Sequence, residues 1–239
     1  MNRIVVTGDT HGVIDTLKID NYQQSPRKLD MSDYLIICGD CGVVWDNDTI
    51  NDSIEYFQGF GTNILFVDGN HENFDLLNAF LVTNWNGGKV HKLGDGVYHL
   101  MRGQVFEICG KKFLTIGGAD SSDRESRIAH VSWWSDERIV YEDIKEANQN
   151  LEKVNYKVDY VITHTPSTKT LNDFIGILTQ CGEAIPYYLQ KKVISTPSSD
   201  MLDWVNKNVR YKQWFCGHLH IDEIIKKVQI LYSEMVEIK

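Results

Sequence analysis

The stretch Ile4-Val5-Val6-Thr7-Gly8-Asp9-Thr10-His11-Gly12 decides the fold, because a short apolar segment ends in two polar side chains flanked by glycine. Residues 4–6 are β-branched and predict a buried strand. The glycines allow the backbone to turn sharply after the strand, and they keep bulky side chains away from Asp9 and His11. In open α/β sheets, sites form beyond the carboxyl ends of strands. The stretch therefore predicts an α/β fold with a site at one edge of a sheet.

The same succession of apolar strand, turn and polar side chain recurs four times further along the chain. Asp9, Asp40 and Asn70 are 31 and 30 residues apart, which is about the length of one strand–helix unit. Because each polar residue ends a predicted strand, we expect their side chains to meet at one edge. The set that we expect to converge is Asp9, His11, Asp40, Asn70, His164, His218 and His220.

These seven side chains have the chemistry of a metal centre. Carboxylate, amide and imidazole donors together suit Mn²⁺, Fe or Zn²⁺ better than Ca²⁺, and the set contains no thiolate. Seven donors are too many for one cation and suit two that share a carboxylate, an arrangement that cleaves phosphate esters. His218 and His220 project the same way if the segment is extended. An amide at Asn70 limits the negative charge, so an anionic substrate can still approach.

The predicted elements favour a layered α/β domain with mixed sheets. Helices and strands alternate early in the chain, and strands dominate from residue 90 to 118. One helix is predicted to begin after Asn47 and another after His71, the second with Phe74, Leu77 and Leu81 on its apolar side. Further helices are predicted at 142–155 and 200–208. Strands are predicted at 4–6, 34–38, 64–67, 112–116, 160–162, 213–216 and 230–238.

Length and composition set further limits. The 239 residues fit one domain or two small ones, and because no linker divides them we expect a single domain over 1–239. No apolar run reaches the ~20 residues that a membrane span needs. The N-terminus enters a strand at once, so we expect no signal peptide and a cytosolic location. Five scattered cysteines do not indicate a disulfide framework. The net charge of −9 argues against broad binding to nucleic-acid backbones.

The ordered pattern Asp9-x-His11, Gly39-Asp40, Gly69-Asn70-His71-Glu72, His164 and Gly217-His218-x-His220 resembles the calcineurin-like metallophosphoesterase superfamily. The resemblance spans residues 8–220 and implies a four-layer α/β/β/α sandwich of two mixed sheets with a dinuclear centre. It implies that Asp40 bridges two cations and that His71 contacts the substrate phosphate and protonates the leaving group. One cation would be held by Asp9, His11 and His220, the other by Asn70, His164 and His218.

The second motif departs from that of the protein phosphatases in this superfamily, which continue it as Gly-Asp-x-x-Asp-Arg-Gly. Here Val43 stands where the acid that pairs with the catalytic histidine would stand, and the arginine that clamps phosphate is missing. This departure argues against a Ser/Thr protein phosphatase. Asp46 and Asp68 are the alternatives for orienting His71.

The loop 117–134 is the candidate for a replacement phosphate clamp. It is rich in glycine and carries Arg124 and Arg127, which we predict as substrate contacts. It also carries Trp133 and Trp134, which could stack on a ring of the substrate. The alternative is a surface loop with its tryptophans packed underneath.

These observations predict a dinuclear metal-dependent phosphoesterase in which a metal-bridging hydroxide attacks phosphorus directly. The expected substrate is a small phosphomonoester or phosphodiester, with a nucleotide as one candidate. A nuclease acting on DNA or RNA is the first alternative, although the acidic charge and the lack of a basic stripe argue against it. A catalytically silent binding module is the second, and the retention of every expected ligand and of His71 argues against that.

Overall fold

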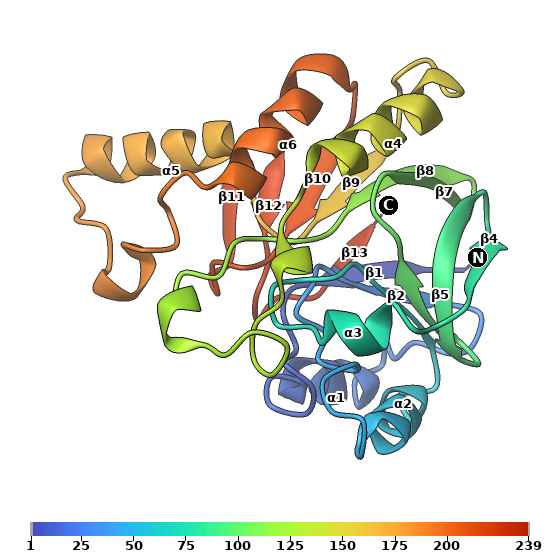
Figure 1. Cartoon of the computed structure of the whole chain (residues 1–239). Helices are drawn as coiled ribbons and strands as arrows, with labels where there is room; N and C mark the ends of the chain where they lie inside the picture. Colours follow the sequence, from blue (N-terminus) through green and yellow to red (C-terminus); the bar gives the residue numbers. More distant parts are fainter. Residues whose placement is uncertain (1, 239) are drawn as a thin grey trace.

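Two mixed β-sheets stacked face to face form the core of the computed structural model, which describes residues 2–238 (Figure 1). The first sheet has the order β13-β1-β2-β3-β6-β5-β4. Strands β1, β2, β3 and β6 run parallel, and β13, β5 and β4 are antiparallel to their neighbours. The bounds are β1 Ile4–Thr7, β2 Tyr34–Ile37, β3 Asn63–Phe66, β4 Val82–Trp85, β5 Gly88–Gly94, β6 Val97–Leu100 and β13 Val236–Ile238.

The second sheet has the order β11-β12-β10-β9-β8-β7. Its central strands β8, β9, β10 and β12 are parallel, whereas β7 and β11 are antiparallel at its edges. The bounds are β7 Gln104–Ile108, β8 Lys111–Ile116, β9 Tyr160–Thr163, β10 Gln213–Cys216, β11 Glu223–Ile225 and β12 Val228–Ile230.

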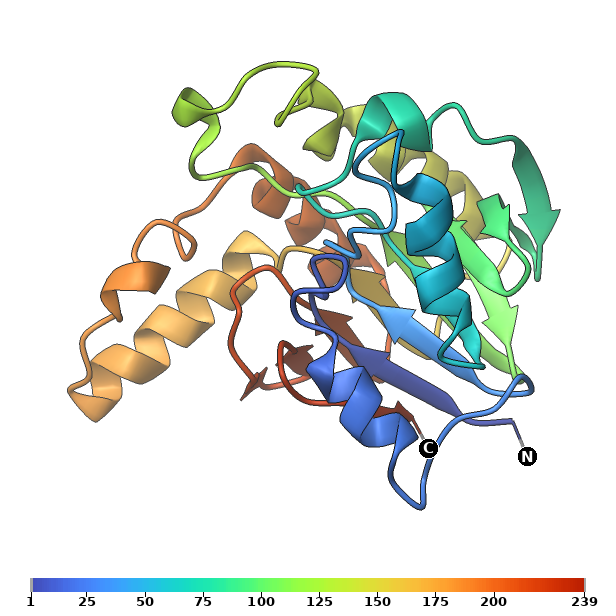
Figure 2. The same cartoon turned by 90° about the horizontal axis from the view of Figure 1, so that it is seen from below.

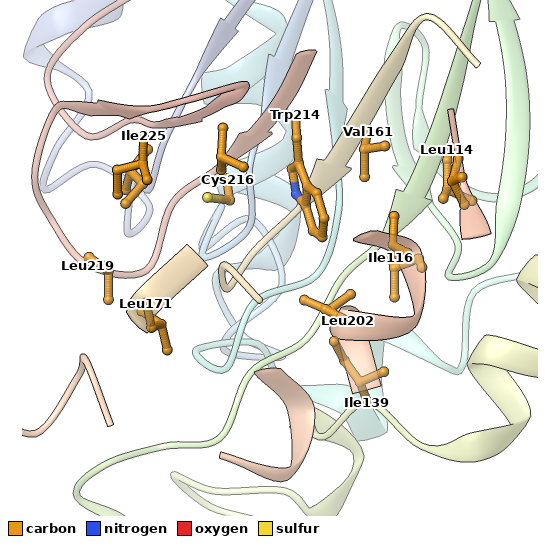
Figure 3. Packing of buried hydrophobic residues seen from close by; sticks show 14 of the residues in the cluster. Leu114, Ile116, Ile139, Val161, Leu171, Leu202, Trp214, Cys216, Leu219 and Ile225 are labelled. Carbon is orange, nitrogen blue, oxygen red and sulfur yellow. The ribbon is translucent and has the colours of Figure 1, made fainter. Parts of the chain in front are cut away.

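Helices cover the outer face of each sheet. The first sheet is covered by α1 (Leu17–Gln23), α2 (Ile50–Gln58) and α3 (Phe74–Leu77), and the second by α4 (Tyr141–Glu152), α5 (Thr168–Cys181) and α6 (Pro197–Asn208). Figure 3 shows Leu171 of α5 and Leu202 of α6 packing near Trp214 of β10. Short 3₁₀ turns lie at Arg124–Ser126, Ser135–Glu137 and Tyr187–Leu189.

Alternation of side chains along the strands produces the layers. In β1, Ile4 and Val6 pack between the two sheets, while Val5 packs under the helices of the first sheet. In β10, Phe215 points between the sheets and Trp214 points toward the outer helices. Since successive side chains of a strand point to opposite faces, both faces of each sheet are buried. The four-layer α/β/β/α sandwich expected from the sequence is confirmed.

The strand order brings the carboxyl ends of six parallel strands to one place. Strands β1, β2 and β3 are neighbours in the first sheet, and β8, β9 and β10 are neighbours in the second. The loops after β1 and β2 lie against each other, with the amide of His11 donating to the carbonyl of Asp40 at 2.8 Å. Figure 2 shows the loop after β2 running up to the N-terminal end of α2. Both sheets therefore supply loops to a single site.

Several predicted elements differ from the observed ones. The helix after His71 ends at Leu77, and Leu81, which was expected on its apolar side, is 87% exposed. The chain turns there into a β4–β5 hairpin through Asn86-Gly87, both at positive φ, an Asn-Gly signal that outweighs the helical spacing. The N-cap residue of α2 is Thr49 rather than Asn47. The predicted strand 230–238 is two separate strands, and α1 and α5 were not predicted.

None of the helices in residues 2–238 has the length and apolar character needed to cross a membrane. The cytosolic location expected from the sequence stays a prediction.

Candidate metal centre

The loops that follow five of the parallel strands, β1, β2, β3, β9 and β10, bring the seven expected side chains together. Donor atoms of Asp9, His11, Asp40 and His220 all lie within 4.8 Å of one another. The remaining three adjoin this group. The Nε2 atom of His164 is 3.2 Å from Oδ1 of Asn70, and the ring of His218 lies 5.0 Å from that of His164. The seven residues come from loops of both sheets and form one cluster.

Asp40 occupies the centre of this cluster. Its Oδ2 atom is 3.4 Å from Nε2 of His11 and also 3.4 Å from Nε2 of His164. Its Oδ1 accepts a hydrogen bond of 2.8 Å from the backbone amide of His71. Asp9 lies on one side, with its Oδ1 3.5 Å from Nε2 of His220. The carboxylate of Asp40 is therefore shared between histidines from the first and the second sheet.

The backbone at this site is held in an unusual conformation. Residues His11, Asp40, His218 and His220 have φ between 45° and 68°, the left-handed region that non-glycine residues rarely adopt. Such strain concentrates at functional sites.

Two glycines beside the cluster are required by close packing. A Cβ at Gly69 would lie 1.9 Å from Oδ1 of Asp40, and one at Gly217 would lie 2.4 Å from Oδ2 of Asp9.

The two carboxylates at the centre are fully buried and rely on histidine for positive charge. Burial would raise the pKa of Asp9, but His220 and His164 lower it to about 2. Asp40 behaves likewise: burial opposes its ionisation, and His164 and His11 hold its pKa well below the ordinary value. Burial disfavours the charged form of His164, yet Asp40 and Asp9 raise its pKa to about 9. The cluster thus calls for positive charge between Asp9 and Asp40.

Hydrogen bonds on the far side of two histidines fix which ring nitrogen faces the cluster. The Nδ1–H of His11 donates to Asp15 at 2.7 Å, and the Nδ1–H of His164 donates to the carbonyl oxygen of Cys38 at 2.8 Å. In the neutral rings, Nε2 then directs a lone pair at the Asp40 carboxylate, so a proton or a cation must lie between them. Ligand histidines are commonly oriented in this way. The donor set therefore fits divalent cations.

Two residues distant in sequence orient Asn70. Its amide Nδ2 donates to the hydroxyl of Ser121 at 3.2 Å. The hydroxyl of Ser121 donates to Oε2 of Glu137 at 2.6 Å, so it must accept from Asn70. Glu137 is completely buried and also accepts the backbone amide of Ser121 at 2.8 Å. This chain of hydrogen bonds directs Oδ1 of Asn70 toward His164.

Two lysines support the loops of the cluster through backbone carbonyls. Lys18 of α1 donates to the carbonyl oxygens of Gly8 and Asp9, at 3.1 and 2.6 Å, and to that of Tyr232. The Tyr232 ring stacks on His220 with 4.8 Å between centroids. Lys192 donates to the carbonyl oxygen of His218 at 2.8 Å. Sequence reasoning did not find these residues or Ser121 and Glu137. Sequence reasoning missed Asp15 as well, although its position four residues after His11 is a signal that the sequence contains.

His71 adjoins the cluster without entering the four-residue group. Its ring centroid is 5.7 Å from that of His11. Burial lowers the pKa of His71, Asp40 opposes that change, and the positive charge of Arg127 reinforces it. Among residues 2–238, no carboxylate forms a hydrogen bond with the imidazole of His71. The ring lies free to contact a ligand.

Neither acid considered as a partner for His71 serves that role here. The Asp68 carboxylate binds Nε2 of His99 at 3.0 Å and Nε of Arg102 at 2.8 Å. Asp46 is exposed and accepts the amide of Asp48. His99 is buried, and its ring stacks on that of His91. Cys38 and Cys41 are buried free thiols.

The arginines of the loop 117–134 have partners inside the loop. The guanidinium of Arg124 lies 4.2 Å from the centroid of the Trp133 ring. Arg127 pairs with Asp123 at 2.7 Å and donates to the carbonyl oxygen of Ser132 at 3.0 Å. Trp134 is buried and donates to Asp75 at 2.7 Å. The contact of Arg124 and Arg127 with a substrate stays a prediction, and Trp134 has a packing role.

Comparison with known proteins places these features in a family. The family described as calcineurin-like phosphoesterase matches residues 2–222. No curated protein matches the chain.

Three solved structures resemble the fold at low identity. The phosphopantetheinyl hydrolase of Mycobacterium tuberculosis is 16% identical, with 97% of this chain and 88% of that chain covered and a TM-score of 0.47. A Staphylococcus aureus protein provisionally named a 5′-nucleotidase is 14% identical, with 96% of this chain covered and a TM-score of 0.46. This chain spans 48% of that protein. A third structure, 10% identical, aligns over 96% of this chain and 89% of its own length with a TM-score of 0.51.

Proposed function

The chain belongs to the calcineurin-like phosphoesterase family, and from this premise we propose that it hydrolyses a small phosphomonoester or phosphodiester with the help of two divalent cations. Asp9, His11 and His220 would hold one cation, and Asn70, His164 and His218 the other. Asp40 would lie between the two. Mn²⁺, Fe and Zn²⁺ all suit this donor set.

The observation that carries the proposal is the position of the Asp40 carboxylate. One oxygen lies 3.4 Å from a histidine assigned to each cation. A single carboxylate flanked by two sets of imidazole donors is the arrangement that a shared ligand requires. Because Asp9 and Asp40 are both buried, leaving them without added positive charge would be unfavourable.

The bound cations would supply an activated water and positive charge for the phosphoryl oxygens. The protein's own groups would then orient the substrate and move protons. Ser121 and Glu137 hold the Asn70 amide with its oxygen toward His164. The backbone bond from His71 to Asp40 keeps the His71 ring beside the cluster at a fixed position.

His71 is the proposed proton donor to the leaving oxygen. No carboxylate of the described residues is hydrogen-bonded to its imidazole, so both ring nitrogens remain available to substrate and solvent. The lowered pKa of His71 means that the ring must take a proton before it can act as an acid. A phosphate dianion in contact with the ring would favour that protonated form.

The test is a screen of phosphorylated metabolites, nucleotides and peptides, together with single-stranded and duplex DNA, against chelator-treated protein reloaded with Mn²⁺. Turnover of small esters, lost with chelator and restored by Mn²⁺, is the expected result. Turnover of DNA alone would favour a nuclease. Tight metal binding without turnover of any compound would favour a silent binding module.

A further inference from the structure

A cavity of about 500 Å³ opens directly beside His11 and His71. Its walls come from the loop after β1 and from the region of α2, and they include Val13, Ile14, Trp45, Tyr56 and Phe57. None of the described residues that line it is an aspartate, glutamate, lysine or arginine. We call this cavity the apolar pocket. Its size and apolar walls are typical of a site for a small organic group.

The apolar side chains at the rim of this pocket lie on a loop that backbone hydrogen bonds hold in place. Ile14 is 76% exposed and Val13 is 67% exposed. The loop that carries them is fixed by backbone bonds from Gly12 to Cys41 at 2.9 Å and from Asp15 to Thr10 at 2.9 Å. Exposed apolar side chains on a fixed loop indicate a binding surface rather than an unfolded segment.

We propose that the apolar pocket binds an uncharged apolar group, aryl or branched alkyl, on the leaving-group side of the phosphoester. This inference rests on the proposed function, because it assigns the part of the substrate that His71 protonates. His71 forms a wall of the pocket and is also the proposed donor to the leaving oxygen. The substituent on that oxygen must therefore extend from His71 into the pocket.

The polar groups of the pocket disfavour other leaving groups. The Tyr56 hydroxyl is bonded to Thr16 at 2.7 Å. Besides the two histidines, the other polar side-chain groups among the described lining residues are the hydroxyls of Thr49 and Ser53 and the indole N–H of Trp45. A sugar, a second phosphate or a phosphopeptide would lose hydration on entering and find few partners. A hydrocarbon ring has no polar groups whose hydration would be lost, and removing its apolar surface from water is favourable.

A series of 4-alkylphenyl phosphates tests the proposal. The para-alkyl group scarcely changes the acidity of the phenol, whose pKa is about 10 as for tyrosine, so the chemical step stays constant along the series. We expect kcat/KM with Mn²⁺ to rise by up to about fourfold for each added CH₂ from phenyl to 4-butylphenyl phosphate. The affinity of the matching 4-alkylphenyl phosphonates, measured by calorimetry, should rise in parallel.

Two isoleucine variants supply the control. Ile14→Ser should flatten the rise with chain length, because it removes an exposed apolar wall of the pocket. Ile224→Ser changes an isoleucine on β11 that is 64% exposed and does not line the pocket. It should leave the rise and the turnover unchanged. Both residues are exposed, so neither variant should disturb folding.

The outcomes separate this inference from the proposed function. If phenyl phosphate is hydrolysed but neither kcat/KM nor phosphonate affinity rises with chain length, the pocket assignment is wrong and the proposed function stands. If no ester is hydrolysed with Mn²⁺, Fe or Zn²⁺, the pocket assignment and the proposed function are both wrong. Concentration-dependent dimerisation that Ile14→Ser abolishes, with a flat series, would identify the pocket as a contact between two copies of the chain.

Discussion

The side-chain amide of Asn70 donates a hydrogen bond of 3.2 Å to the hydroxyl of Ser121, which in turn donates to the buried carboxylate of Glu137. This bond decides which end of the Asn70 amide faces His164. A carbonyl oxygen can bind a cation, whereas an amide NH₂ group cannot. The orientation of Asn70 therefore depends on a residue 51 positions further along the chain.

Replacing Ser121 by alanine removes that orientation. We expect Ser121→Ala to weaken Mn²⁺ binding or kcat/KM by about 10–100-fold, the range found when partners of metal ligands are lost. Calorimetric titration of chelator-treated protein measures the first quantity and steady-state kinetics the second. Ser122→Ala, a change at the exposed neighbour, is the matched control. Equal behaviour of the two variants would show that Ser121 does not position Asn70.

Replacing the carboxylate of Asp40 should abolish most of the effect of Mn²⁺ on the thermal stability of the protein. Mn²⁺ should raise the Tm of the chelator-treated protein, because a ligand that binds only the folded state stabilises it. Asp40→Asn should lose most of this rise and all turnover, since the amide brings no charge to two cations. Asp46→Asn, at an exposed site six residues further on, should keep both. A full metal-dependent rise in the Asp40→Asn protein would contradict the central position of Asp40.

His71 should affect rate far more than metal binding. As a proton donor it is expected to contribute roughly 10²–10⁴-fold, so His71→Ala should lose about that much in kcat with poor leaving groups. The loss should be smaller for 4-nitrophenyl phosphate, whose leaving group needs little protonation. The Mn²⁺ affinity should be retained, because the ring lies outside the group of close donor atoms. An equal loss for both esters would indicate a positioning role instead.

Acid should destabilise the fold through Asp33. Burial opposes ionisation of this carboxylate, but bonds from the Arg3 side chain and backbone lower its pKa below the ordinary 3.8. A lowered folded-state pKa gives stability that is present above about pH 4 and lost as the pH falls through the folded pKa. Asp33→Asn should lower the free energy of unfolding by about 1–3 kcal/mol at pH 7, and the difference should shrink below about pH 3.

Urea unfolding at both pH values measures this effect. Asp95→Asn is the matched control, because Asp95 pairs with Lys92 at 2.8 Å but its side chain is 92% exposed. Exposed ion pairs contribute little, so this variant should unfold like the parent protein at either pH. A difference for Asp33→Asn that is the same at pH 7 and at low pH would show that its carboxylate charge does not contribute.

The order of polar residues at strand ends could be predicted from the sequence because each case is local. A β-branched run such as Ile4-Val5-Val6 forms a strand, the glycine that follows allows the turn, and Asp9 then lies at the carboxyl end whatever the rest of the chain does. Strand-to-helix spacing is also local, and β1, β2 and β3 do pair as parallel neighbours. The layered fold and the residues of the cluster follow from such local rules.

The partners of these residues were decided only by the tertiary structure. Ser121 meets Asn70, Lys18 meets the carbonyl of Tyr232, and Cys38 meets His164 because two sheets pack face to face. Contacts across 51 to 214 residues leave no period in the sequence, because they depend on which strands become neighbours rather than on the residues beside them. The sequence by itself therefore determined which donors the protein carries, and the packing of the two sheets decided how each donor is oriented.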